Sequence, residues 1–592
     1  MPGLYGFTKT HDNSLNDLEV MTSAMFLYDH FKQDTLFESD DIFSSRLHLN
    51  VIGDKNSPKE SNNIYIWVEG EAYNTADACK LVNIEPESFS VSLLNAYRIN
   101  GLDKFLNKID GYFTAVIYDG NLKKVLLISD RYGLKPLYLY EKNGHLAWAS
   151  HVKGIVSLSH VDKTLNNKAL NCFLDIGYFL GEATWFEHIQ LIKPASVVEF
   201  DLAKQKTSQR YYWQWSEIKP KNVEFELAVE QLGALLLKAV EKRFSPAESI
   251  GIPISGGLDS RCLFAAVREL YPEFKGFAFT FGKMDCDDVV IAKKVMSGSG
   301  WAYQTFLLTK DNWFKPRFKK VEDTDGLKDI LHMHGSEFLP QIKDKMSISL
   351  NGYLGDAVLG GSYLNILDLM DTKIDRALVQ KLYGHHIDEI DFNFYDINHI
   401  DPFLYMNRAR RLINAGSINS LSFVEQRKPF FDNDIMEFVF SLPDSYRKNN
   451  LIYSQALLKV FPKYFKTIPW QNTGNTIDKL FTKPSFLKRA FNKIKRELLA
   501  TMGIKDVKNF TDYPNWIRED DVSSQLSQLL KYKGSIYSQY TNIDFYKQYL
   551  EPHLKFRYID NSKMILRACT FVIYLNSLKN DGVEPLITKK DI

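Results

Sequence analysis

The sequence is poor in cysteine and contains no long apolar run. Its 592 residues include five cysteines, which lie far apart and form no CxxC pair. This spacing argues against a disulfide framework or a zinc site and fits a reducing compartment. No segment approaches the roughly 18 consecutive apolar residues that span a bilayer, and the N-terminus lacks the basic-then-apolar pattern of a signal peptide. We therefore expect a cytoplasmic protein without a membrane span.

Net charge is almost absent too. Lysine and arginine together number 73, and aspartate and glutamate number 72, so the formal net charge at pH 7 is +1. A chain without a global positive field gives no electrostatic reason to expect nucleic acid or acidic lipid as a partner. The apolar fraction of 45% and the charged fraction of 24% are those of a soluble globular protein. The chain is too long to fold around a single hydrophobic core, and its length predicts about two to four domains.

The phosphate-binding pattern GxxxxGK[ST] is missing, but a different one occurs in the middle of the chain. The hexamer SGGLDS follows the apolar run Ile250–Ile254 and precedes a helix-like segment. Its glycines let the backbone approach a ligand, and the helix start presents unpaired N–H groups to an anion. Its aspartate can hold a divalent cation that bridges phosphates. The preceding strand and the complete hexamer disfavour the alternative, an ordinary serine–glycine turn.

The hexamer resembles the PP-loop of ATP pyrophosphatases, which cleave ATP between its α- and β-phosphates and hand AMP to an acceptor. The resemblance implies that ATP binds at this turn and that the aspartate of the turn holds Mg²⁺. The residues that are implied to contact ATP here are Ile254, Ser255, Gly256, Gly257, Leu258, Asp259 and Ser260.

Strand and helix signals differ between the two halves of the chain. Residues 1 to about 150 are predicted to form short strands broken by turns, including a hairpin turn at Asp119-Gly120-Asn121. From about residue 225, strands alternate with helices, which predicts a parallel doubly wound sheet with its ligand at the carboxyl ends of the strands. The expected strands are 64–68, 112–118, 125–128 and 137–140 in the first half and 249–254, 276–281, 302–307 and 346–351 in the second.

Four segments of the first half resemble, in order, the motifs of class II glutamine amidotransferases. Residues 1–6 resemble MCGIxG, 68–74 resemble VNGEIYN, 110–113 resemble LDGxFA and 130–138 resemble RDxxGxKPLY. The first half is therefore similar to the glutaminase domain of asparagine synthetase. The resemblance implies an N-terminal-nucleophile amidotransferase-like fold over residues 1–215, in which two antiparallel sheets lie between helix layers (αββα).

The catalytic residues of that glutaminase site are replaced. Pro2 stands where the family has its cysteine nucleophile, so no thiol can attack an amide. Glu69, followed by Gly70 and Glu71, stands where a family asparagine stabilises the oxyanion, and a carboxylate there would repel the developing charge. Arg46 resembles the arginine that grips the glutamine carboxylate, or it is a solvated strand arginine. We predict no glutaminase activity and a domain kept as a scaffold or a substrate-docking surface.

A segment of the second half resembles asparagine synthetases. Residues 350–361 resemble LSGEGADELFGG. Gly352 belongs to the implied ATP site, and Asp356 takes the place of the aspartate that shares Mg²⁺ with the PP-loop. The alternative role of Asp356 is that of a helix N-cap. Phe279 lies in a strand that resembles the family's adenine-packing strand, or it belongs to the core. These segments imply a PP-loop ATP pyrophosphatase domain over residues 225–480.

Two departures from the asparagine synthetase pattern bear on the chemistry. Tyr353 stands where asparagine synthetases carry glutamate, as in β-lactam synthetases, where such a tyrosine and a glutamate deprotonate the attacking amine. Residues 407–424, which should hold that glutamate, contain none. Three roles for Tyr353 therefore stay open: it helps to deprotonate the amine, it orients the substrate, or it only packs in the core. A lysine that neutralises the transferring phosphate falls on Asn472 here. Lys479 and Lys483 are candidates to replace it, or they belong to a solvated basic helix.

Residues 481–592 are helix-like and basic at first, which predicts a C-terminal helical extension with a solvated face or a contact for an acidic partner. The resemblance implies an ATP-dependent amide ligase that uses ATP and Mg²⁺, takes a carboxylate substrate and an amine donor, and acts alone or with a biosynthetic partner protein. We expect the amine to come from elsewhere than glutamine bound in this chain, as in intramolecular ring closure by β-lactam synthetases and lasso-peptide cyclases. The alternatives are an ammonia-dependent amidotransferase for a surface-sugar or metabolite carboxylate and a non-catalytic ATP-binding scaffold.

Overall fold

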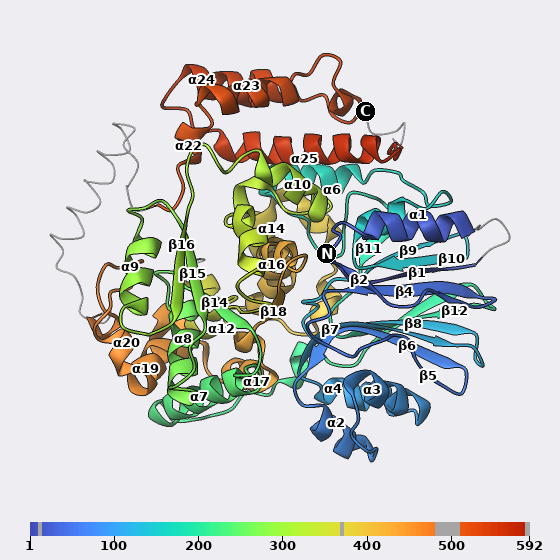
Figure 1. Ribbon diagram of the computed structural model, residues 1–592, viewed down its shortest axis with the longest axis horizontal. Coiled ribbons are helices and arrows are strands. Elements are labelled where there is room, and N and C mark those ends of the chain that lie inside the picture. Colours follow the sequence, from blue (N-terminus) through green and yellow to red (C-terminus); the bar gives the residue numbers. More distant parts are fainter. Residues whose placement is uncertain (10–14, 367–371, 480–508, 587–592) are drawn as a thin grey trace.

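Two antiparallel sheets packed face to face form the N-terminal part of the chain in the computed structural model (Figure 1), which describes residues 1–9, 15–366, 372–479 and 509–586. The first sheet has the order β11-β9-β10-β1-β4-β2, with β3 paired to β4, and the second has the order β13-β12-β8-β7-β6-β5. The strands of the first sheet are β1 (Leu4–Thr8), β2 (Lys32–Gln33), β3 (Phe37–Glu38), β4 (Ile42–His48), β9 (Tyr138–Lys142), β10 (His145–Ala149) and β11 (Ile189–Leu191). Those of the second are β5 (Lys59–Ser61), β6 (Ile64–Ala72), β7 (Gly111–Asp119), β8 (Lys124–Ser129), β12 (Ser196–Asp201) and β13 (Lys206–Tyr211).

Alternating side chains explain this four-layer arrangement. In β7, Val116 and Tyr118 point between the two sheets, whereas Phe113, Ala115 and Ile117 join the core under the helices on the other side. Helices cover both outer faces (Figure 1). They are α1 (Leu15–Met25), α5 (Val152–Val156) and α6 (Asn167–Ile176) on the first sheet and α2 (Thr75–Val82), α3 (Phe89–Arg98) and α4 (Leu102–Lys108) on the second. The four strands predicted in this half are confirmed, as is the β7–β8 hairpin.

A five-stranded parallel sheet follows, in the order β16-β15-β14-β17-β18, so the strand that leads into SGGLDS lies at its centre. The predicted parallel sheet is confirmed. β18 was not predicted, because its three residues are polar and give no strand signal; their charges are paired with residues far away in the sequence. The strands are β14 (Ile250–Pro253), β15 (Phe277–Gly282), β16 (Ala302–Leu307), β17 (Ile348–Leu350) and β18 (Glu425–Arg427).

The C-terminal unit, which we define as residues 509–586, forms a separate helical layer (Figure 1). Its longest helix, α25 (Ser562–Asn580), lies against α6 and α10 (Pro316–Asp323). Trp185 stacks on Phe571 with 5.5 Å between ring centroids, and the Ile330 amide donates to Thr570 Oγ1 at 2.9 Å. Within the described ranges, no helix is both long and apolar enough to cross a bilayer. The predicted domain boundaries at 215, 225 and 480 remain predictions.

Candidate functional site

The SGGLDS turn connects the end of β14 to α8 (Asp259–Leu270) at the carboxyl edge of the parallel sheet. Its serines close the turn, since the Ser255 amide donates to Ser260 Oγ at 3.0 Å and the Gly257 amide to Ser255 Oγ at 3.2 Å. A Cβ on Gly256 would lie 2.3 Å from Oε1 and 2.9 Å from Cβ of Gln471, so a larger residue here would require Gln471 to move. The predicted strand, turn and helix therefore occur where the sequence placed them.

Three residues at this turn were not predicted. Asp288, at the start of α9 (Asp287–Met296), accepts the Gly256 amide at 2.8 Å. Tyr453 donates its hydroxyl to Asp259 Oδ1 at 3.0 Å. Arg261 is fully buried under the turn and donates to the carbonyls of Gly256, Ile468 and Pro469. In the described part of the chain no carboxylate pairs with Arg261, and burial lowers its pKa to about 10.

The structure brings Asp259 and Asp356 together. The Asp356 amide donates to Asp259 Oδ2 at 2.9 Å, and a Cβ on Gly355 would lie 2.6 Å from Asp259 Cγ. Burial and the neighbouring Asp356 carboxylate raise the pKa of Asp259 well above its usual range. Two adjacent carboxylates are the hard oxygen ligands that Mg²⁺ prefers, so this donor set fits the ion. The N-cap alternative for Asp356 is wrong, because α12 (Gly355–Gly360) has Leu354 as its N-cap and Asp356 lies in the first turn.

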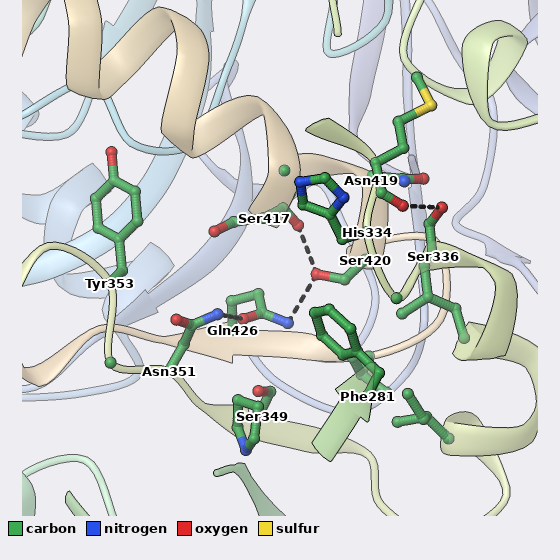
Figure 2. Close-up of a pocket in the computed structure, with 18 of the residues that line it drawn as sticks. Phe281, His334, Ser336, Ser349, Asn351, Tyr353, Ser417, Asn419, Ser420 and Gln426 are labelled. Atoms are coloured by element: carbon green, nitrogen blue, oxygen red, sulfur yellow. Dashed lines mark hydrogen bonds between the residues drawn. The ribbon is translucent and has the colours of Figure 1, made fainter. Parts of the chain in front are cut away.

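A cavity of about 360 Å³ lies beside these two turns, on the face of the sheet opposite α8. Phe279, Gly352 and Tyr353, all predicted site residues, contribute to its wall. A chain of hydrogen bonds runs along the cavity from Asn351 Nδ2 to Gln426 Oε1 at 2.8 Å and from Gln426 Nε2 to Ser420 Oγ at 2.9 Å (Figure 2). Among the described residues, no lysine, arginine, aspartate or glutamate side chain lines it. The cavity therefore suits an uncharged group.

Phe279 belongs to the core as well as to the cavity wall. It is 7% exposed, and its ring centroid lies 6.0 Å from those of both Phe277 and Phe306. The two interpretations offered for it by the sequence are therefore compatible. Gly352 contacts the turn directly, because a Cβ there would lie 3.0 Å from the Ser260 amide nitrogen.

Tyr353 is buried, and its hydroxyl donates to the carbonyl of Ala409 at 2.8 Å. Figure 2 shows the hydroxyl directed away from Asn351 and Gln426. Burial raises the pKa of the phenol well above its usual range. In the described part of the chain no carboxylate is hydrogen-bonded to this hydroxyl, so the glutamate of the predicted dyad has no counterpart there. This geometry fits the packing role.

The segment predicted to carry the missing lysine does lie at the SGGLDS turn. The Gln471 amide donates to the Gly256 carbonyl at 3.3 Å, and the neighbouring Asn472 and Lys479 are exposed. Lys483 and the rest of the basic run that follows it lie outside the described residues. The buried cation nearest to this turn in sequence is therefore Arg261, which the sequence analysis did not single out.

The glutaminase-like centre is filled by its own side chains. Pro2 is buried, and Glu69 Oε1 lies 2.8 Å from Lys135 Nζ. Arg46 is 1% exposed and donates to Asp34 Oδ2 at 2.6 Å and to two backbone carbonyls at 2.7 Å each. The interpretation of Arg46 as a solvated strand arginine is therefore wrong, because interior acceptors surround its guanidinium. Arg46 can grip a ligand carboxylate only by giving up one of these partners.

Charged pairs join this centre to the parallel sheet. Gly70 has a φ of 116° and passes so close to β7 that a Cβ would lie 2.1 Å from the Tyr112 carbonyl oxygen. Its neighbour Glu71 pairs with Arg427 of β18 at 2.7 Å. Lys135 also lies 3.8 Å from Glu425 of β18. The first-half segment that resembles VNGEIYN therefore helps to hold the two halves together.

Lys428 is a buried lysine at the same boundary. Its Nζ lies 4.6 Å from the ring centroids of both Tyr112 and Tyr353 and donates to Asn414 Oδ1 at 2.5 Å. Burial lowers its pKa from the usual 10.5 to about 7. An unfolded chain would bind this proton up to a much higher pH, so the lysine lowers stability at pH 7 and below, and this cost disappears as the pH rises towards 10.

We expect Lys428→Met to raise the free energy of unfolding by roughly 2 kcal/mol at pH 7, because removing the amine outweighs the lost hydrogen bond to Asn414. The gain should shrink at pH 9. Lys135→Met is the matched control: it removes another buried lysine but leaves Glu69 and Glu425 unpaired, which should destabilise the protein by about 3 kcal/mol. Urea denaturation at both pH values measures the changes. A Lys428→Met protein less stable than wild type at pH 7 would contradict the prediction.

Comparisons with known proteins agree with these two halves. Residues 1–213 match the family described as "Glutamine amidotransferase domain", and residues 231–389 match the family described as "Asparagine synthase". Asparagine synthetase [glutamine-hydrolyzing] 2 of Bacillus subtilis (strain 168) is 24% identical over 457 residues, which cover 68% of this chain and 60% of that protein. Asparagine synthetase [glutamine-hydrolyzing] of Rattus norvegicus is 26% identical over 397 residues, which cover 65% of this chain and 66% of that protein.

The chain thus matches less than two thirds of the length of the Bacillus subtilis relative. Among solved structures, the glutamine phosphoribosylpyrophosphate amidotransferase from B. subtilis complexed with ADP and GMP aligns with a TM-score of 0.25 and 10% identity, covering 52% of this chain and 80% of that one. Residues 1–213 match an amidotransferase domain, residues 231–389 match an asparagine synthase domain, and asparagine synthetases are similar over both segments, so the chain resembles the asparagine synthetase superfamily.

Proposed function

We propose that this chain is an ATP-dependent, AMP-forming carbon–nitrogen ligase. It adenylates a substrate carboxylate and couples it to an amine that does not come from glutamine hydrolysed in this chain. The observation that carries the proposal is the meeting of Asp259 and Asp356 at the carboxyl edge of the parallel sheet, beside a cavity without charged lining. Open α/β sheets bind their ligands at this edge.

The first half-reaction needs a nucleotide whose α-phosphate is reachable by a carboxylate. The SGGLDS turn receives the phosphates, and the neutral cavity receives the nucleoside. Asp259 and Asp356 would hold Mg²⁺, which when bound offsets the charge of the phosphates and of the leaving pyrophosphate. A carboxylate oxygen attacks the α-phosphorus, the bond from that phosphorus to the oxygen bridging the α- and β-phosphates breaks, and pyrophosphate leaves with the electron pair.

The second half-reaction forms the amide. The amine nitrogen attacks the acyl carbon, AMP leaves with the electron pair of the acyl–oxygen bond, and the amine loses a proton to AMP or water. Arg261 offsets the loss of the family lysine, because this buried cation holds the carbonyl of Gly256 in the turn and adds positive charge beneath the phosphates. Tyr353 forms part of the cavity wall and positions its neighbours.

The filled glutaminase-like centre favours an external amine. Pro2 offers no thiol, Glu69 is held by Lys135, and Arg46 is engaged by protein acceptors. The amine is therefore free ammonia, ammonia from a partner protein or an amine on the substrate itself. Amidation by ammonia of a sugar or metabolite carboxylate and ring closure within one substrate are the two forms of the reaction that meet this condition.

The proposal is tested by pyrophosphate release from Mg-ATP with a panel of carboxylates, each assayed with and without ammonium. We expect release that depends on both the carboxylate and Mg²⁺. A carboxylate that is amidated only when ammonium is present identifies an amidotransferase, and one that forms a cyclic product without ammonium identifies a ring-closing ligase. Protein that binds Mg-ATP but releases no pyrophosphate with any of the carboxylates would support a non-catalytic scaffold instead.

A further inference from the structure

The far wall of the neutral cavity is supported by the C-terminal unit, which lies beyond the part of the chain matched by either family. Phe510 of this unit packs edge-on against His334, with 4.8 Å between ring centroids, and lies 6.4 Å from the ring of Phe281. Both His334 and Phe281 line the cavity. The Lys283 amide, directly after β15, donates to the Phe510 carbonyl at 3.3 Å. The unit therefore forms part of the proposed nucleoside site.

Tyr513 of this unit and Arg317 of α10 form a hydrogen-bonded chain that ends at His334. Arg317 Nη1 donates to the hydroxyl oxygen of Tyr513 at 2.8 Å, and this hydroxyl lies 2.7 Å from His334 Nδ1. Because a guanidinium can only donate, the tyrosine oxygen accepts from Arg317 and its single proton is free for the imidazole. This arrangement favours Nδ1 as an acceptor and the proton of the neutral ring on Nε2.

The surroundings keep the ring neutral and fixed. Burial first, and then the nearby Arg317 cation, lower the pKa of His334 well below its usual 6.5. The ring stacks on Tyr513 at an interplanar angle of 17°. Arg317 is itself buried and anchored to Glu337 at 2.5 Å and to the Ile330 carbonyl at 2.7 Å. His334 lines the cavity together with Ser417, Asn419 and Ser420 (Figure 2).

We propose that His334 reads the nucleobase of ATP by donating a hydrogen bond from Nε2, and that Tyr513 and Arg317 act as positioning residues that hold it in this tautomer. The C-terminal unit thereby takes part in nucleotide recognition. The group that is recognised is an unprotonated ring nitrogen of the purine, which accepts but carries no charge, as the neutral lining requires. This inference rests on the proposed function, because it takes the ligand of the cavity to be ATP.

The test measures the dissociation constants of Mg-ATP and of its 1-deaza, 3-deaza and 7-deaza analogues for the full chain by calorimetry. Each analogue replaces one acceptor nitrogen by carbon. For wild type, the analogue that lacks the contacted nitrogen should bind about three- to tenfold more weakly than ATP. His334→Phe, which keeps the aromatic packing, should bind ATP more weakly than wild type by about the same factor. It should bind the analogue that lacks the contacted nitrogen no more weakly than it binds ATP.

Tyr513→Phe provides a second variant that leaves His334 in place. It removes the proton offered to Nδ1, so the imidazole can adopt the other tautomer, and ATP affinity should fall by about two- to fivefold. The 15N chemical shifts of labelled histidine should show the Nε2-protonated tautomer of His334 in wild type and a mixture in the variant. A purely structural role of Tyr513 would leave the tautomer unchanged.

The outcomes separate this inference from the proposed function. If wild type binds Mg-ATP and His334→Phe binds it within twofold of wild type, the inference is overturned while the proposed function stands. It is also overturned if each of the three analogues loses as much affinity relative to ATP in His334→Phe as it does in wild type. If wild type does not bind Mg-ATP at all, the proposed function itself fails.

Discussion

Asp259→Ala is expected to lower pyrophosphate release by on the order of a thousandfold, because it removes one of the two carboxylates available to Mg²⁺ at the turn. Asp356 is the partner carboxylate, and its amide binds Asp259 Oδ2 at 2.9 Å, whereas the other carboxylate at this turn, Asp288, is already engaged by the Gly256 amide at 2.8 Å. Substrate-dependent pyrophosphate release measures the change. As a control, Asp311→Ala removes an exposed carboxylate of a surface loop and should leave the rate within twofold.

Asp259→Asn separates the loss of metal binding from loss of the fold. The amide keeps the size of the side chain, and Tyr453 can reverse its hydroxyl to accept from it. It also removes the repulsion between two neighbouring carboxylates in the absence of a cation, so the metal-free protein should gain about 1 kcal/mol in free energy of unfolding. The pKa of Asp259 is raised in the folded state, so its carboxylate opposes folding once the pH exceeds the pKa that it has in the unfolded chain. Removing the carboxylate should therefore stabilise the metal-free protein at neutral pH. An Asp259→Asn protein that retains full activity would refute the assignment.

The second large effect concerns glutamine. Wild type is expected to release no ammonia from glutamine, and Pro2→Cys should not restore hydrolysis. A new thiol at this position would still meet Glu69, whose carboxylate is fixed 2.8 Å from Lys135 Nζ where an oxyanion donor is needed. One missing oxyanion donor costs about a hundred- to a thousandfold in rate. Arg46 would also have to leave Asp34 to receive the glutamine carboxylate.

Ammonia release from glutamine, followed with 15N-amide-labelled substrate, measures this activity. The glutamine-hydrolyzing asparagine synthetase 2 of Bacillus subtilis, a relative at 24% identity, serves as the positive control. The double exchange Pro2→Cys with Glu69→Asn should exceed Pro2→Cys alone if the carboxylate is the obstacle. Hydrolysis by unmodified protein at a rate near that of the control would show that the N-terminal half is an active glutaminase.

The antiparallel strands and four of the five parallel strands could be predicted because their signals are local. β7 is rich in aromatic and β-branched residues and is buried over almost its whole length, and the apolar run that contains β14 ends where SGGLDS begins. β18 could not be predicted. Its Glu425 and Arg427 are buried only because Lys135 and Glu71, each separated from them by more than a hundred positions, neutralise them.

The residues of the candidate site also fall into two groups, those that sequence motifs located and those that only the folded structure revealed. Sequence motifs located Asp259, Asp356 and Gly352, whereas Arg261, Asp288 and Tyr453 carry no motif that distinguishes them from ordinary helix residues. Arg46 could be recognised as a site residue, but its burial and its partners could not be read from its neighbours in the chain. His334 depends on Tyr513, 179 positions away.

The order of residues along the chain therefore determined which elements form, where the SGGLDS turn lies and that position 2 carries no thiol, because each of these depends on side-chain type and short spacing. The folded arrangement decided which charges neutralise one another, how the hydroxyl of Tyr353 is used and that the C-terminal unit reaches the cavity. Those outcomes depend on contacts between segments far apart in the chain, and such contacts form only when the burial of apolar surface brings the segments together.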